Sequence, residues 1–138
     1  MNTPIDDKQI RIQNWLVRAR NALHDANFLF QKDDHYSGVV DRAYYSMLYA
    51  VFALLVPLNR KWKMDGDEKI IALFDEKFIK QNILPSHMSK TLHDAYKLHR
   101  ADEFQDFFVV SKEQASDILN SSVEFLKAIE RKLLEKLE

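Results

Sequence analysis

The sequence predicts an all-α protein, a four- to five-helix up-and-down bundle with long first, second and last helices. Three observations predict this fold class. Apolar residues recur at spacings of three and four over long stretches, strand-like alternation is absent, and the 138 residues include only two glycines. Hairpin turns need glycine for positive φ, so this depletion argues against a β-rich fold. The length suits a single domain, which we expect to cover residues 1–138.

The first two helices follow from their apolar patterns. Asp6 can cap a helix with Gln9 three residues further on, and the apolar positions that follow keep one face apolar for about 25 residues. The second helix begins at 35–37 and runs to Val56. Because its centre, 44–55, is apolar on nearly all sides, we expect it to be the most buried helix.

Breakers and caps divide the rest of the chain. A third helix is predicted over 67–81, with its phenylalanines and isoleucines facing inward. Pro85 suits the first position of a fourth, shorter helix, which we expect to end near Leu98. The aromatic and acidic segment 102–110 is typical of a loop. Ser111–Gln114 has the pattern of a capping box that opens the last helix.

Composition excludes several kinds of protein. The absence of cysteine removes disulfides, thiol catalysis and Cys-ligated zinc, and fits a reducing compartment, so we expect a cytoplasmic protein. Residues 2–9 are polar, which argues against a signal peptide. The longest apolar run, 50–57, is far shorter than the roughly 20 residues that span a bilayer, so we expect no membrane segment.

Charge and glycine content together restrict how this chain can bind phosphate. A net charge of −1 gives no bulk attraction to nucleic acid, so any such binding needs a local site. Gly38 and Gly66 lie too far apart for a glycine-rich phosphate loop. A phosphate group would therefore have to be held by side chains on helices.

The histidines do not form a recognisable metal motif. Di-iron bundles use Glu-x-x-His so that both ligands project inward, and no histidine here has an acid three residues before it. His87, His93 and His99 recur every six residues, a spacing that turns each by about 240° from the last on a helix. The sequence therefore predicts no metal site, and we expect no cofactor.

One candidate site lies on the second helix. Arg42, Tyr45 and Tyr49 are spaced three and four, so they share a face of that helix. An arginine on an apolar helix is costly unless it is paired or contacts an anion. Arg42 could form a structural bridge to Glu103 or Asp106, with the tyrosines in the core. Alternatively, Arg42 binds phosphate in a cleft where Tyr45 or Tyr49 stacks or hydrogen-bonds.

A second candidate is the segment 99–107, where charges and aromatics alternate at a helix-to-loop junction. His99 and Arg100 could face an anionic ligand. Alternatively, Phe104 and Phe107 cap the bundle while the charges stay in water. A basic loop with one tryptophan, 60–63, could contact RNA but has the composition of an ordinary surface loop.

These residues resemble the HEPN domain (higher eukaryotes and prokaryotes nucleotide-binding), in its small stand-alone prokaryotic branch. The most specific element is Arg42–Met47 on the second helix. It is preceded by 15–23 in the first helix and followed by 74–85, then by 103–107 before the capped final helix. The resemblance covers about residues 8 to 135 and implies a helical bundle that usually dimerises, with a cleft for nucleotides or RNA.

The resemblance also implies partners and a reaction. Family members often act beside a small nucleotidyltransferase as a toxin–antitoxin pair. Many are metal-independent ribonucleases in which an arginine is followed, after four to six residues, by a histidine on a late helix. There, histidine is the acid or base and arginine holds the phosphate during attack by the 2′-OH.

This sequence departs from the ribonuclease pattern in two places. Arg100 is the late-helix arginine, yet no histidine follows it, and His99 precedes it instead. Arg18 and His24 have the spacing, but they lie on the first helix and about 240° apart. Where the stand-alone branch often has a histidine, seven residues before Phe74, this chain has Asp67. The departures favour binding over cleavage.

Three functions follow as hypotheses. The leading one is a homodimeric nucleotide- or RNA-binding module, the partner of a small nucleotidyltransferase in a toxin–antitoxin-like pair. A ribonuclease that uses His99 or His24 with an arginine is the second, and a structural partner without a ligand is the third. In the leading hypothesis two arginines neutralise phosphate, two tyrosines stack or hydrogen-bond, and two acids orient the arginines. These residues are Arg42 and Arg100, Tyr45 and Tyr49, and Glu103 and Asp106.

Overall fold

The computed structural model of the chain describes residues 7–32, 34–58 and 66–137. The α-helices in these ranges are α1 (Asp7–Gln31), α2 (Tyr36–Leu55), α3 (Asp67–Phe74), α4 (His87–Phe104) and α5 (Lys112–Leu137). A 3₁₀ turn, η1 (Val56–Leu58), follows α2, and a π-helical turn, η2 (Asp75–Ile79), follows α3. No strand occurs within the described ranges, and the predicted all-α class is confirmed.

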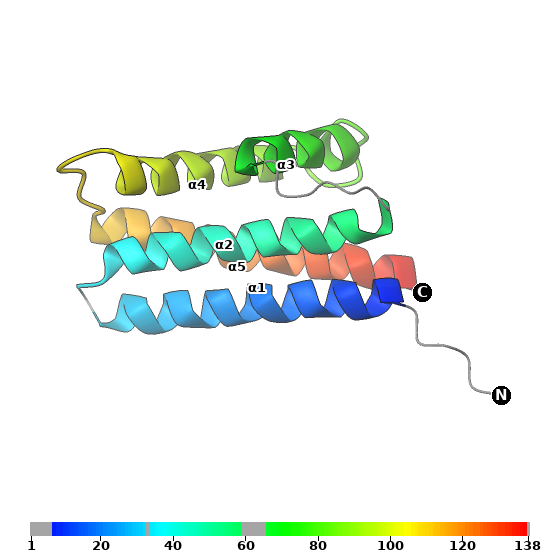
Figure 1. The fold of residues 1–138 in the computed structure, drawn as a ribbon, viewed down its shortest axis with the longest axis horizontal. Coiled ribbons are helices and arrows are strands. Elements are labelled where there is room, and N and C mark those ends of the chain that lie inside the picture. The colour runs from blue at the N-terminus through cyan, green and yellow to red at the C-terminus, as the bar shows by residue number, and fades with distance from the viewer. Residues whose placement is uncertain (1–6, 33, 59–65, 138) are drawn as a thin grey trace.

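The long helices form an up-and-down bundle. α1 and α4 run in one direction and α2 and α5 in the other, with α3 in the connection between α2 and α4 (Figure 1). α2 packs against α1, α4 and α5, whereas α3 and α4 lie on the side of α2 away from α1 (Figure 1). The predicted bundle with long first, second and last helices is therefore confirmed.

The core forms around α2, as its sequence predicts. Thirteen of the 20 residues of α2 are buried, and they include the polar side chains of Tyr44 and Ser46. Buried hydroxyl groups join α2 to its neighbours. Ser46 Oγ donates to the Ala19 carbonyl oxygen on α1 at 2.8 Å, and Ser122 Oγ on α5 donates to the Ala43 carbonyl oxygen at 3.1 Å.

One segment of the described chain, Tyr36–Leu58, is long and apolar enough to cross a membrane by length and composition alone. Within its most apolar stretch, 78% of the residues are buried inside the bundle. A central bundle helix that is covered on all sides has this composition.

Two predicted helix boundaries are wrong. The fourth helix begins at His87, two residues after Pro85, and it continues past Leu98 to Phe104. No glycine or proline interrupts 98–104, so nothing in the local sequence stops the helix there. The extension matters for the site, because it places Glu103 one helical turn after His99.

The predicted third helix, 67–81, is not a single regular helix. α3 ends at Phe74, and η2 continues it with a wider turn in which the Lys80 amide donates to the Asp75 carbonyl oxygen at 2.9 Å. The π turn keeps Phe78 in the core and brings Asp75 Oδ2 to 2.7 Å from His93 Nε2 on α4. The insertion of a π turn leaves no clear mark on the apolar pattern.

Caps explain where α3 and α5 begin. Gly66 precedes α3 with a φ of 111°, a conformation that glycine adopts without strain. At α5, the Gln114 amide donates to Ser111 Oγ and the Ser111 amide donates to Gln114 Oε1, both at 3.0 Å. These reciprocal bonds are the predicted capping box. The predicted cap at Asp6 lies outside the described residues.

Candidate functional site

A cleft of about 440 Å³ opens between α2, the start of α3 and the C-terminal half of α4. It contains four of the residues that the sequence singles out: Tyr45, His99, Arg100 and Glu103. The remaining lining residues are Gly66, Asp67, Glu68, Lys69, Tyr96 and Phe104. The cleft brings a residue of the α2 candidate, Tyr45, together with residues of the candidate segment 99–107. We therefore take this cleft as the candidate site.

The inner wall of the cleft is a stacked pair of rings tied to α3. Tyr44 is fully buried, and its hydroxyl donates to Asp67 Oδ2 at 2.7 Å. His99 stacks on the Tyr44 ring with the centroids 4.6 Å apart and the planes 17° from parallel. Tyr45 meets the His99 ring edge-on at 5.4 Å. These contacts connect α2, α3 and α4 at one point and fix the shape of the wall.

Burial keeps the tyrosines of this wall protonated. Burial raises the pKa of Tyr44 far above its ordinary value, and the hydrogen bond to the Asp67 carboxylate raises it further. The pKa of Tyr45 is also raised, first by burial and then by the nearby Asp67 and Asp41 carboxylates. Both phenols therefore act as neutral hydroxyl groups at physiological pH.

His99 is held between two acids. Its Nε2 lies 3.1 Å from Glu103 Oε2, one helical turn further along α4, and its Nδ1 lies 3.8 Å from Asp41 Oδ1 on α2. The side chain itself is buried. With both ring nitrogens facing carboxylates and the ring stacked on Tyr44, His99 joins α2 to α4 and positions the cleft wall.

Arg100 supplies positive charge at the mouth of the cleft. Its guanidinium carbon lies 4.5 Å from the centre of the Phe104 ring and 5.8 Å from that of Tyr96. Among the described residues, Arg100 contacts these rings and forms no ion pair with an acid. An exposed guanidinium of this kind, oriented by aromatic faces, keeps its hydrogen-bond donors available to a ligand.

The lining carries both signs of charge. Asp67, Glu68 and Glu103 are acidic, whereas Lys69 and Arg100 are basic. Glu68 Oε1 accepts a hydrogen bond from the Tyr96 hydroxyl at 3.1 Å, so one acid already has a partner on the opposite wall. Such a balance does not favour a long polyanion, but it suits a ligand with one or two phosphates and several hydroxyl or amino groups.

Arg42 and Tyr49 lie beside the cleft rather than in it. Arg42 sits 5.7 Å from the centre of the Tyr45 ring, and its Nε is 3.7 Å from Asp41 Oδ2. That Nε is buried and lacks a hydrogen-bond partner among the described atoms. Tyr49 packs against Tyr45 and against Trp15 on α1, at 5.8 Å in both cases. Tyr45 is the residue that connects this row to the cleft.

The two acids expected to orient the arginines lie apart. Glu103 contacts His99, as described above, and Asp106 is exposed in the turn between α4 and α5. The structural bridge from Arg42 to either acid is not formed. Arg42 is paired instead with Asp41, its neighbour in sequence.

The turn between α4 and α5 also differs from one sequence-based alternative. Phe104 and Phe107 do not cap the bundle, because their side chains are 62% and 100% exposed. Phe108 packs against the core instead. Phe107 has a φ of 66°, which turns its side chain out toward solvent. The basic loop 60–63 lies outside the described residues.

Three residues that form the cleft could not be identified as such from the sequence alone: Tyr44, Asp67 and Tyr96. Tyr44 belongs to the Arg42–Met47 element, but the surrounding sequence is apolar on nearly all sides of the helix. The pattern therefore predicts a core residue and no hydrogen bond from its hydroxyl. The sequence does mark Asp67, because the family branch that this chain resembles often has a histidine at that position. Its partner Tyr44 is 23 positions away in sequence, so the spacing could not reveal the hydrogen bond.

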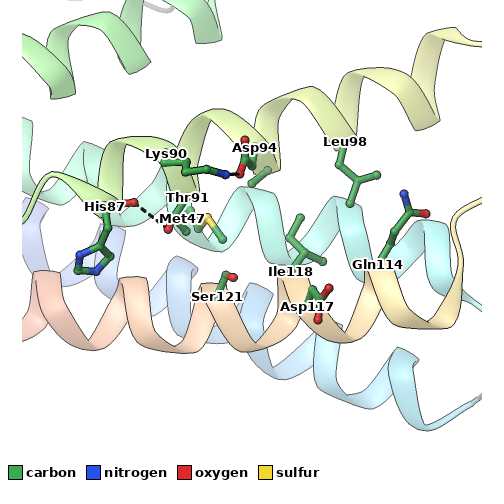
Figure 2. Close-up of a pocket in the computed structure, with 11 residues that line it drawn as sticks. Met47, His87, Lys90, Thr91, Asp94, Leu98, Gln114, Asp117, Ile118 and Ser121 are labelled. Carbon is green, nitrogen blue, oxygen red and sulfur yellow. Dashed lines mark hydrogen bonds and ion pairs between the residues drawn. The ribbon is translucent and has the colours of Figure 1, made fainter.

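A separate groove of about 410 Å³ lies between α4 and α5 (Figure 2). Met47 of α2 forms its floor together with Ile118 and Leu98, whereas polar side chains stand along its edges (Figure 2). The polar groups of α4 are paired among themselves: Lys90 with Asp94, and the Thr91 hydroxyl with the His87 carbonyl oxygen. None of the predicted phosphate-binding, stacking or orienting residues lines this groove.

No group of three or more potential metal ligands is found among the residues that the structure describes. His93 and Asp75 form a pair away from the cleft. The sequence-predicted histidine candidate His24 is on the exposed side of α1, far in the fold from Arg100 on α4.

The fold and cleft define a small helical-bundle protein with an aromatic, mixed-charge site between its second and fourth helices. Residues 12–132 match the HEPN domain family, and the chain belongs to this family. It is 28% identical over 134 residues to a "UPF0332 protein" of Thermotoga maritima, covering 97% of this chain and 98% of that protein. It is 26% identical over 125 residues to a "Putative toxin" of Methanocaldococcus jannaschii, covering 91% of this chain and 83% of that protein.

Proposed function

We propose that this HEPN domain is a nucleotide- or RNA-binding module of a toxin–antitoxin-like pair, and that the cleft between α2, α3 and α4 is its binding site. The observation that carries the proposal is Arg100, an exposed guanidinium held over two rings at the mouth of the cleft. Family membership and the name of the M. jannaschii relative support the toxin-related setting.

Each part of a nucleotide has a matching part of the cleft. Arg100 binds the phosphate through charge-assisted hydrogen bonds. The rings of Tyr45, Tyr96 and Phe104 offer faces on which a base can stack. The acids of the lining, Asp67, Glu68 and Glu103, accept hydrogen bonds from ribose hydroxyls or from the amino groups of a base. Since acids outnumber bases in the lining, the cleft takes one nucleotide unit rather than a long stretch of backbone.

The assignment of Arg42 changes within this proposal. Sequence spacing places Arg42 with Arg100 on the phosphate, whereas the structure puts Arg42 against Asp41 and Tyr45, outside the lining. In this proposal Arg100 alone binds the phosphate, and Arg42 positions Tyr45. Tyr49 supports the same residue from the next turn of α2.

The test is a titration of AMP and of a short fluorescein-labelled single-stranded RNA against the protein. Arg100→Gln is expected to weaken binding at least tenfold, because it removes a charge-assisted contact to phosphate. It should also lower the slope of log affinity against log salt by about one. Arg11→Gln, an exposed arginine on α1, is the matched control and should bind as wild type. Equal affinity of the Arg100 and Arg11 variants would rule out the cleft.

A ribonuclease is the second candidate, because His99 and Arg100 lie side by side on the wall of the cleft. Histidine would move the proton of the 2′-OH and arginine would stabilise the phosphate charge. Against this, both His99 nitrogens already face carboxylates. RNA incubated with the protein and a chelator decides between the two: cleavage that His99→Gln abolishes establishes an enzyme, and intact RNA supports binding alone.

Pairing with a small nucleotidyltransferase belongs to the same proposal. It is supported by membership of a family whose stand-alone members often work in that way. The neighbouring reading frame is expected to encode a small nucleotidyltransferase, and the two purified proteins should elute together from a size-exclusion column. Separate elution at micromolar concentration would contradict the pairing.

A further inference from the structure

A row of aromatic rings leads from the cleft across α2 to α1. It begins at Tyr45, whose ring meets that of His99 in the wall of the cleft. The Tyr49 ring lies 5.8 Å from that of Tyr45, and the Trp15 ring on α1 lies 5.8 Å from that of Tyr49. Among the described residues, the other ring contact of Trp15 is with the buried Phe52, so the aromatic row of Tyr45, Tyr49 and Trp15 ends on α1.

The aromatic row lies on the one strip of α2 that the bundle leaves uncovered. α2 runs between α1 on one side and α3 and α4 on the other (Figure 1). From residue 39 to residue 55, all of them described, the side chains of α2 that are not buried are those of Asp41, Arg42, Tyr45 and Tyr49. Trp15 is also partly exposed. A ligand in the cleft can therefore continue along the row without displacing the core.

An arginine lies over a ring at each end of the row. The guanidinium carbon of Arg18 is 4.8 Å from the centre of the Trp15 ring, and that of Arg42 is 5.7 Å from the centre of the Tyr45 ring. Arg100 lies over two further rings in the cleft. All arginine–ring contacts among the described residues thus lie on this row or in the cleft to which it leads.

The two guanidinium groups of the row have donors available to a ligand. Arg18 is exposed, and among the described residues it contacts the Trp15 ring and forms no ion pair with an acid. The Nε of Arg42 is 3.7 Å from Asp41 Oδ2, too far for a hydrogen bond, and has no other partner among the described atoms. A planar guanidinium binds phosphate oxygens at its edge and stacks on flat rings through its face.

Rings that alternate with arginines suit a single strand of nucleic acid. Bases stack on aromatic faces whatever their sequence, and arginines contact the phosphates between them. Neighbouring rings of the row are 5.8 Å apart, wider than the rise of about 3.4 Å between bases stacked in a helical strand. The row therefore takes bases that are separated from one another, as in an extended single strand. Asp41, the acid of the strip, already faces Arg42 and His99.

We propose that a single-stranded RNA places one nucleotide in the cleft and continues along the aromatic row. Arg42 and Arg18 hold phosphates further along the strand, and Tyr49 and Trp15 lie against its bases. Arg42 then both positions Tyr45 and binds the phosphate next to the one in the cleft. RNA fits better than DNA, because the acids of the cleft accept hydrogen bonds from 2′-hydroxyl groups. The inference rests on the proposed function, since the row starts at the cleft, and it extends the site to several nucleotides.

The test compares AMP with a fluorescein-labelled hexanucleotide of adenylate, because the row contacts only a strand longer than one nucleotide. Calorimetry measures the affinity for AMP, and fluorescence anisotropy measures the affinity for the hexamer. Wild type should bind the RNA hexamer more tightly than AMP by about tenfold or more, and more tightly than the DNA hexamer of the same sequence.

Two substitutions on α1 remove the far end of the row and leave the cleft intact. Arg18→Gln should weaken binding of the hexamer by about fivefold and lower the slope of log affinity against log salt by about one, with the affinity for AMP unchanged. Trp15→Leu keeps an apolar side chain against Phe52 but removes the stacking surface, and should also weaken the hexamer by about fivefold. Because Arg18 is exposed, its variant should retain the fold even if the Trp15 variant loses stability.

Each variant has a matched control on α1. Arg20→Gln removes an arginine that is turned about 200° around the helix from Arg18 and is paired with an acid of α5. Phe28→Leu removes a ring that also carries a cation, Lys32 at 4.7 Å, but is turned about 220° from Trp15. Both controls should bind the hexamer as wild type does.

Three results would overturn the inference. One is equal affinity for AMP and the RNA hexamer. Another is an Arg18 variant that binds the hexamer as tightly as the Arg20 variant. The third is a DNA hexamer that binds as tightly as the RNA. If AMP still binds in these cases, the proposed function stands and only the extension along the row fails, whereas a protein that binds neither AMP nor the hexamer contradicts both.

Discussion

The hydroxyl of Tyr44 offers a direct way to weigh the contact on which the cleft is built. Tyr44→Phe removes the donor to Asp67 Oδ2 and keeps the ring and its stack on His99. A hydrogen bond to a carboxylate contributes about 1.5–3 kcal/mol, so the free energy of unfolding of the variant should be about 2 kcal/mol lower than that of wild type. With an unfolding entropy of about 2.1 cal/mol/K per residue over 138 residues, the midpoint temperature falls by about 7 °C.

Urea and thermal unfolding, followed by far-ultraviolet circular dichroism, measure both quantities. Tyr96→Phe is the matched control, because its hydroxyl donates to Glu68 at the exposed rim of the cleft. That variant should lose less than about 0.5 kcal/mol. If Tyr44→Phe unfolds as easily as Tyr96→Phe, the buried contact does not hold α3 to the bundle and the reasoning about the inner wall is refuted.

Three further predictions follow from the buried and capping contacts. The folded pKa of Tyr44 is raised above its unfolded value of 10.0, so its stabilising effect is complete below pH 10 and is lost as the pH rises toward the folded pKa. The difference in unfolding free energy between wild type and Tyr44→Phe, measured by urea unfolding, should therefore shrink by about 1 kcal/mol between pH 10 and 11. A constant difference would contradict this prediction. Ser46→Ala removes the buried bond to the Ala19 carbonyl and should cost about 1 kcal/mol of unfolding free energy, whereas no loss would mean that the bond is not needed. Ser111→Ala breaks the capping bond from the Gln114 amide and should cost about 1 kcal/mol, measured in the same way, with a neutral effect counting against the cap.

Most of the fold could be predicted because its signals are local. The spacing of apolar residues fixes α1 and the buried α2, and Ser111 with Gln114 marks the start of α5. The boundaries of α4 were missed for a physical reason. The charged and aromatic residues after Leu98 have the composition of a loop, although none of them prevents a helix. The helix continues to Phe104, and only then do His99 and Glu103 lie one turn apart and in contact.

The site was predicted in part. Tyr45, His99, Arg100 and Glu103 come together because α2 and α4 are neighbours in the bundle. Arg42 shares a helix face with Tyr45, yet the rotation of α2 within the bundle turns it away from the cleft. Such rotation depends on packing against three helices at once, and no local spacing encodes it.

The central claim is that the cleft binds a nucleotide, and an NMR titration with AMP tests it most directly. With ¹⁵N-labelled protein, the amides of Tyr45, Tyr96 and Arg100 should shift progressively as AMP is added. Those of Thr91 and Ser121, in the groove between α4 and α5, should stay in place. Shifts confined to that groove, or a spectrum that AMP leaves unchanged, would contradict the account.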